Sequence, residues 1–95
     1  MFVVIVTYKK PIEIVEKYLA EHLVFLDQGY QKNYFIVSGR KVPRTGGVIV
    51  SQLNDREKLE AFIKTDPFYI HEVVDYELIE FVAGKHHPNF ASFLM

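Results

Sequence analysis

The chain has 95 residues with a formal net charge of −1, no cysteine and no tryptophan, and 49% of its residues are hydrophobic. This length fits one domain with a modest core, and the lack of cysteine excludes disulfide or thiolate chemistry. The balanced charge, with no basic run longer than two residues, argues against nucleic-acid binding, and no apolar run reaches the roughly 20 residues of a membrane span, so we expect a cytoplasmic protein with no nucleic-acid or membrane partner.

The first part of the chain predicts a strand and a long helix. Residues 2–8 (FVVIVTY) are β-branched and apolar on both faces, which is typical of a central strand buried on both sides. Pro11 suits the first position of a helix that we expect over residues 11–32, with Asn33 as a left-handed stop. An earlier end at Gly29 is the alternative, because glycine inside a helix costs about 1 kcal/mol relative to alanine. The predicted buried face of this helix consists of Val15, Tyr18, Leu19, His22, Leu26 and Tyr30.

The second part predicts a hairpin, a second helix and a last strand. Strands are expected at residues 34–39 and 48–53, on either side of a cationic loop over residues 40–46. Gly46 and Gly47, at the end of this loop, are expected to form a turn. Asn54 with Glu57 gives the capping-box pattern of a helix that ends at residues 65–67. Residues 73–81 form the last strand.

The order βαββαβ predicts a ferredoxin-like α+β fold, a four-stranded antiparallel sheet with both helices on one face. The domain covers residues 1–83, and residues 84–95 are a C-terminal tail whose apolar side chains are one candidate contact for a neighbouring protein. The sheet face without helices carries too much apolar surface for a small monomer. We therefore expect a homodimer that packs sheet against sheet and closes a dimeric α+β barrel.

The candidate catalytic residues are His22 and Asp66. His22 interrupts an apolar helix face, so it is either a general acid/base or a core histidine satisfied by one hydrogen bond. Asp66 before Pro67 is either the acceptor that orients His22 or simply the cap of a short helical turn. The helical rise places His22 about 17 Å from Pro11, so Asp66 must reach back along the helix to meet it. A separation beyond about 6 Å would remove the pair.

Three further residues are candidates for substrate binding. Arg44 in the cationic loop has the planar guanidinium that holds a carboxylate, and Ser38 closes the strand beside it. The competing interpretation is a solvated hairpin tip. Phe68, in the turn after Asp66, completes the set. His86 and His87 have no cysteine or helical partner, so we expect neither a metal site nor a cofactor.

Three segments resemble one family. They are EHLVFL at Glu21 to Leu26, SGRKVPRTGG at Ser38 to Gly47, and DPFY at Asp66 to Tyr69. In this order the chain resembles YciI-like (YCII-related) proteins over residues 1–81. The resemblance implies dimeric α+β barrels similar to muconolactone isomerase. It also implies a pocket with a His–Asp dyad, which falls on His22 and Asp66.

The resemblance leaves two functional hypotheses. The activity known among relatives is that of a dehalogenase acting on a chlorinated muconolactone, which implies a cofactor-free lyase or isomerase that uses the dyad on a small organic acid. The alternative is a non-catalytic module that binds a small ligand or a partner and in which the His–Asp pair is structural. In both cases the expected partners are a second copy of the chain and an unidentified small molecule.

Overall fold

The fold is built from strands and helices in the predicted order, and the computed structural model describes residues 1–94. The elements are β1 (Phe2–Tyr8), α1 (Ile12–Gln31), β2 (Phe35–Arg40), β3 (Gly46–Ser51), α2 (Arg56–Ile63), α3 (Pro67–Ile70), β4 (Val74–Glu80) and the 3₁₀ helix η1 (Pro88–Phe93). The strands form one antiparallel sheet in the order β2-β3-β1-β4. This confirms the ferredoxin-like fold with β1 and β3 in the centre.

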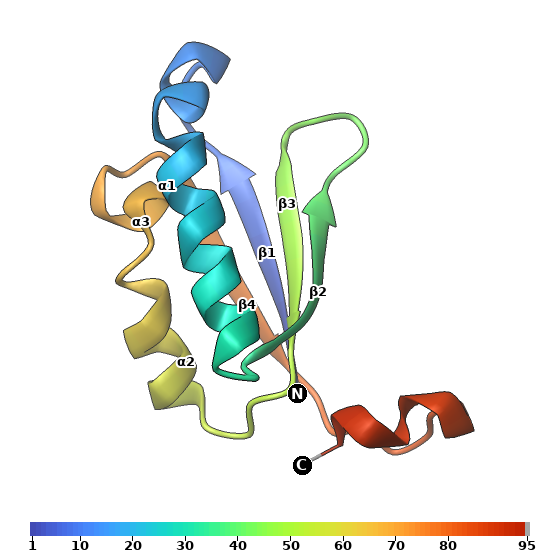
Figure 1. Cartoon of the computed structure of the whole chain (residues 1–95). Coiled ribbons are helices and arrows are strands. Elements are labelled where there is room, and N and C mark those ends of the chain that lie inside the picture. Colours follow the sequence, from blue (N-terminus) through green and yellow to red (C-terminus); the bar gives the residue numbers. More distant parts are fainter. Residues whose placement is uncertain (95) are drawn as a thin grey trace.

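The helices α1, α2 and α3 cover one face of the sheet, and the core lies between the two layers (Figure 1). Along β1 the side chains of Phe2, Val4 and Val6 are buried in this core, at most 4% exposed. They pack in one cluster with Val15 of α1 and Leu59 of α2. The alternation along β1 follows from the two-residue period of a strand, which sends every second side chain to the opposite face.

The opposite face of the sheet is apolar and has no helix over it. Cross-strand partners share a face, and the register joins Val3 to both Val50 and Ile79. The side chains on this face include Val3, Ile5, Val37, Val48, Val50 and Ile79. Val37 is 53% exposed and Ile79 45% exposed. The prediction that β1 is buried on both sides is therefore wrong for the single chain, in which only the helix face is covered.

The long version of the first helix is correct. α1 passes through Gly29, and this position favours glycine because the ring of Phe35 lies 2.2 Å from where an ideal Cβ would stand. Asn33 has the predicted left-handed conformation, with φ of 58°. Pro11 precedes the helix as its N-cap residue instead of starting it, since its ψ of 154° is extended. Tyr30 was predicted to lie on the buried face of the helix, but it is 36% exposed. Phe25, which was not predicted there, is buried.

Two further local predictions are wrong. Asp55 and not Asn54 caps α2, with its carboxylate accepting a hydrogen bond from the backbone N–H of Lys58 at 3.1 Å. Gly46 and Gly47 lie in β3 and not in a turn. The reason is that they pair with Val6 and Thr7 of β1, and the packing there is so close that a Cβ on Gly46 would stand 1.8 Å from the carbonyl oxygen of Val6. Within residues 1–94, no helix is both long and apolar enough to cross a membrane.

Candidate active site

His22 and Asp66 meet in the structure. The imidazole Nδ1 of His22, in the middle of α1, lies 2.9 Å from Oδ1 of Asp66, which precedes α3. The contact depends on α3 lying against α1, where the ring of His71 stacks on Tyr18 at 4.1 Å. The short turn thus returns Asp66 along the helix to the level of His22, and the predicted pair is present.

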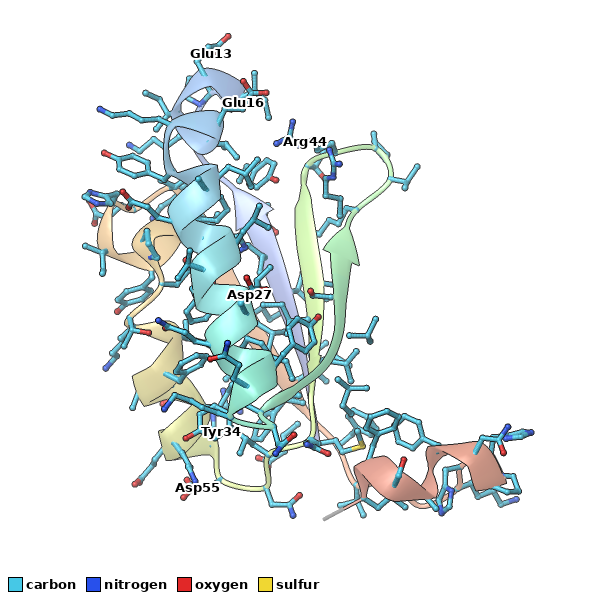
Figure 2. All side chains as sticks on the ribbon, in the orientation of Figure 1. Glu13, Glu16, Asp27, Tyr34, Arg44 and Asp55 are labelled. Atoms are coloured by element: carbon cyan, nitrogen blue, oxygen red, sulfur yellow. The ribbon has the colours of Figure 1, made fainter. Side chains whose placement is uncertain are left out.

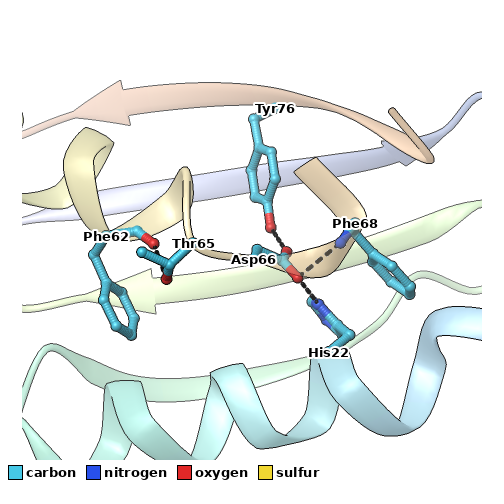
Figure 3. A network of polar contacts seen from close by, with 6 residues as sticks. All are labelled: His22, Phe62, Thr65, Asp66, Phe68 and Tyr76. Atoms are coloured by element: carbon cyan, nitrogen blue, oxygen red, sulfur yellow. Dashed lines mark hydrogen bonds and ion pairs between the residues drawn. The ribbon is translucent and has the colours of Figure 1, made fainter. Parts of the chain in front are cut away.

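The Asp66 carboxylate is the centre of a buried network (Figure 3). Its side chain is fully buried and accepts hydrogen bonds from His22 Nδ1, from the backbone N–H of Phe68 at 3.0 Å and from the hydroxyl of Tyr76. A buried carboxylate requires such partners, since an unpaired one is very costly. Burial raises the pKa of the Tyr76 phenol, and the nearby Asp66 charge and hydrogen bond raise it further, so Tyr76 remains a neutral donor.

This network assigns the tautomer of His22. An ionised carboxylate only accepts hydrogen bonds, so the proton of the neutral imidazole is assigned to Nδ1 and the lone pair to Nε2. The ring is held flat against Phe68, with centroids 4.0 Å apart and planes 7° apart. His22 is therefore fixed in both tautomer and orientation.

A pocket of about 600 Å³ opens beside His22, which lies in its wall. Its volume is in the range of small-molecule sites. Much of the lining is apolar and includes Val6, Leu19, Leu26, Ile49 and Phe68. Residues with polar side chains also line it, and these are Tyr8, Glu16, His22, Ser38, Arg40 and Arg44. The arrangement suits a small, mostly apolar molecule with a few polar atoms.

The structure brings the predicted site residues together around this pocket. His22, Ser38, Arg44 and Phe68 line it, and Asp66 lies behind His22. The hydroxyl of Ser38 pairs with that of Tyr30 at 2.6 Å. The side chain of Arg44 is 28% exposed and lies in the wall of the pocket.

Tyr76 and Glu16 are site residues that the sequence interpretation missed. A signal for Tyr76 existed, because alternation along residues 73–81 places it on the same face as Val74 and Leu78. A hydroxyl on a core face needs a hydrogen-bond partner. Glu16 had no comparable signal, because nothing in the sequence pairs it with Arg44.

No group of three or more histidine, cysteine, aspartate or glutamate side chains that could hold a metal ion is found among residues 1–94. The pair His86–His87 lies in the tail, where the ring of His86 and the side chain of His87 make only local hydrogen bonds.

Fold and site together define a ferredoxin-like α+β protein with a buried His–Asp pair beside a pocket of small-molecule size. The family model for the YCII-related domain matches residues 1–82, and the chain belongs to this family. A search of curated proteins finds no significant match.

Among solved structures, the chain is similar to the 5-chloro-2-hydroxyhydroquinone dehydrochlorinase from Burkholderia phenoliruptrix AC1100 in complex with 2,5-dihydroxybenzoquinone. The TM-score is 0.71 at 18% sequence identity, and the match covers 88% of this chain and 96% of the dehydrochlorinase chain. At this identity the similarity concerns the fold.

Proposed function

We propose that this protein is a cofactor-free lyase or isomerase that moves a proton on a small organic acid, with His22 as the general acid/base. The observation that carries the proposal is the fixed imidazole in the pocket wall, with Nδ1 bound to Asp66 at 2.9 Å. A ring held in this way has one nitrogen occupied by the orienting carboxylate and the other free for proton transfer.

The chemistry follows from the tautomer. Nε2 takes a proton from the substrate, and the electron pair of the broken bond forms a new double bond. In a lyase a leaving group such as chloride departs with its electron pair; in an isomerase the same nitrogen returns the proton to another atom of the substrate. The negative charge of Asp66 stabilises the imidazolium that forms in between. Arg44 and Ser38 are proposed to hold the anionic or polar end of the substrate, and Phe68 to contact its ring.

The similar dehydrochlorinase supports the elimination version of this proposal, since its name describes the loss of hydrogen chloride from a hydroxylated ring. A chlorinated hydroxyquinol is therefore the first substrate to test. Its flat ring suits apolar walls, and its ionisable hydroxyl groups suit a pocket with a guanidinium.

The decisive test is His22→Ala with such a substrate, followed by chloride release. General acid/base catalysis contributes about 10²–10⁴-fold, so we expect turnover to fall by at least about a hundredfold. His86→Ala is the matched control, because His86 is exposed in the C-terminal tail, does not line the pocket and should leave turnover unchanged. Turnover of His22→Ala within about threefold of wild type would refute the mechanism.

A second candidate function is ligand binding without turnover. It is favoured by the structural role of Asp66, which caps α3 by accepting a hydrogen bond from the Phe68 N–H whether or not His22 reacts. Under this hypothesis ligands shift the NMR signals of the pocket residues, yet no member of a substrate panel is converted and His22→Ala changes affinity alone.

We also propose that two copies associate through the apolar sheet face that contains Val3, Val37 and Val50. Wild type should have the mass of a dimer in light scattering at micromolar concentration. Val50→Lys, which changes the centre of this face, should have the mass of a monomer. Val24→Lys, at a 56% exposed valine of α1, is the control and should remain dimeric. A monomeric wild type would rule out the proposal. We propose separately that the protein is cytoplasmic, which cell fractionation would test.

A further inference from the structure

The mouth of the pocket contains an ion pair that no proton-transfer step uses. Nη1 of Arg44, in the β2–β3 loop, lies 3.5 Å from Oε1 of Glu16 on α1. Figure 2 shows the two side chains at the same end of the molecule, where the start of α1 approaches the loop. Both residues line the pocket.

This ion pair satisfies Arg44 poorly. A guanidinium and a carboxylate at their best make two parallel, short hydrogen bonds, whereas here a single contact spans 3.5 Å. Nε of Arg44 is buried and has no hydrogen-bond partner within residues 1–94. A buried donor without a partner is unfavourable, so the guanidinium would gain by turning Nε and one Nη atom toward an acceptor.

Glu16 is poorly placed to become that acceptor, because its side chain is 60% exposed and favours water, while that of Arg44 is 28% exposed. A carboxylate on a ligand inside the pocket would meet the guanidinium from the apolar side. There the dielectric is lower and the bidentate pair is stronger.

We infer that Glu16 is an internal competitor for the anion site of Arg44, and that the pocket selects small aromatic carboxylates and related organic anions by exchanging this weak ion pair for a bidentate one. The inference rests on the proposed function for the location of the site. It adds Glu16 as a residue that tunes affinity for the anionic ligand.

The test is binding of benzoate, with benzamide as the neutral molecule of the same shape, to uniformly ¹⁵N-labelled full-length protein. Glu16→Gln should bind benzoate about threefold to fivefold more tightly than wild type, the scale of an exposed ion pair, with no change for benzamide. Benzoate should also shift the Arg44 Nε–H signal. Arg44→Gln should weaken benzoate binding by at least about tenfold and cancel the effect of Glu16→Gln in the double variant.

Glu13→Gln is the matched control, since it removes the same charge three residues earlier in α1 at a residue that does not line the pocket. The inference is overturned if Glu13→Gln gains as much as Glu16→Gln, or if benzamide gains equally. It is also overturned if Glu16→Gln binds benzoate no better than wild type, or shows no binding at tens of millimolar. None of these measurements depends on turnover. An inactive enzyme that still shows the Glu16 effect would refute the proposed function alone.

Discussion

Replacing Asp66 by asparagine removes the charge of the buried network while retaining its shape. Oδ1 of Asp66 accepts from both His22 Nδ1 and the Phe68 N–H, and Oδ2 accepts from Tyr76. With its amide oxygen at the Oδ1 position, asparagine still serves the first two donors. Its NH₂ group then faces Tyr76, whose hydroxyl can turn and accept. The donors of His22 and Phe68 keep their acceptor and the His22 tautomer is unchanged, whereas the O–H of Tyr76 loses its acceptor Oδ2.

The expected cost comes from the loss of charge. Hydrogen bonds to charged groups contribute about 1.5–3 kcal/mol and neutral ones about 0.5–1.5 kcal/mol, so three bonds lose about 3 kcal/mol in total. Removing a buried charge returns part of this, because its desolvation is no longer required. We expect Asp66→Asn to lower the free energy of unfolding by about 2 kcal/mol, which lowers Tm by roughly 8–16 °C for a domain of this size.

Asp66→Ala provides the contrast. It leaves the donors of His22, Phe68 and Tyr76 without their acceptor, each at about 1–3 kcal/mol, a sum comparable to the whole stability of a small domain. Urea denaturation followed by far-UV circular dichroism measures both variants, and the ¹⁵N shifts of the His22 ring report the tautomer. The reasoning is refuted if Asp66→Asn is as stable as wild type, or if alanine and asparagine cost the same.

Two further predictions concern Tyr76 and Gly29. Burial and Asp66 raise the pKa of the Tyr76 phenol, so above about pH 10 the folded state keeps a proton that the unfolded state loses. Wild-type stability is therefore complete below that pH and falls above it, by up to about 1.4 kcal/mol per pH unit, and urea midpoints of Tyr76→Phe should fall less steeply. Gly29→Ala drives a Cβ to within 2.2 Å of the Phe35 ring. Its overpacking cost of about 1–3 kcal/mol should outweigh the gain of about 1 kcal/mol in helix propensity, so Tm falls, whereas Gln28→Ala should leave Tm nearly unchanged.

The fold could be predicted because its signals are periodic and local. The two-residue alternation, the 3.6-residue stripe and the Asp66–Pro67 turn each depend on residues close in sequence, and together they allow few topologies. The errors in the predicted elements lie where backbone from another part of the chain determines the local structure. Gly46 and Gly47 have the composition of a turn, yet the approach of Val6 makes them part of β3. Asn54 and Asp55 are both good caps, and only the path of the chain after β3 selects Asp55.

The site was predictable for a different reason. The family resemblance, and not the pattern, joined His22 to Asp66, since no periodicity relates two residues 44 positions apart. The contacts that complete the site arise from tertiary packing. Tyr76 approaches Asp66 from β4, and Glu16 approaches Arg44 across the mouth of the pocket. Neither contact has a local sequence signal strong enough to name the partner.

One carboxylate oxygen connects the fold of this protein with its proposed chemistry. Oδ1 of Asp66 accepts the first-turn N–H of α3 at Phe68 and also the Nδ1 proton of His22. The capped turn places the Phe68 ring against the imidazole, so the cap that begins α3 also fixes how His22 faces the pocket. Asp66 can therefore have a structural and a catalytic role at the same time. A loss of stability in an Asp66 variant does not show whether the residue also takes part in catalysis. The distinction has to be made at the free nitrogen of His22 and at the guanidinium of Arg44, because these groups line the pocket and the described residues satisfy neither of them well.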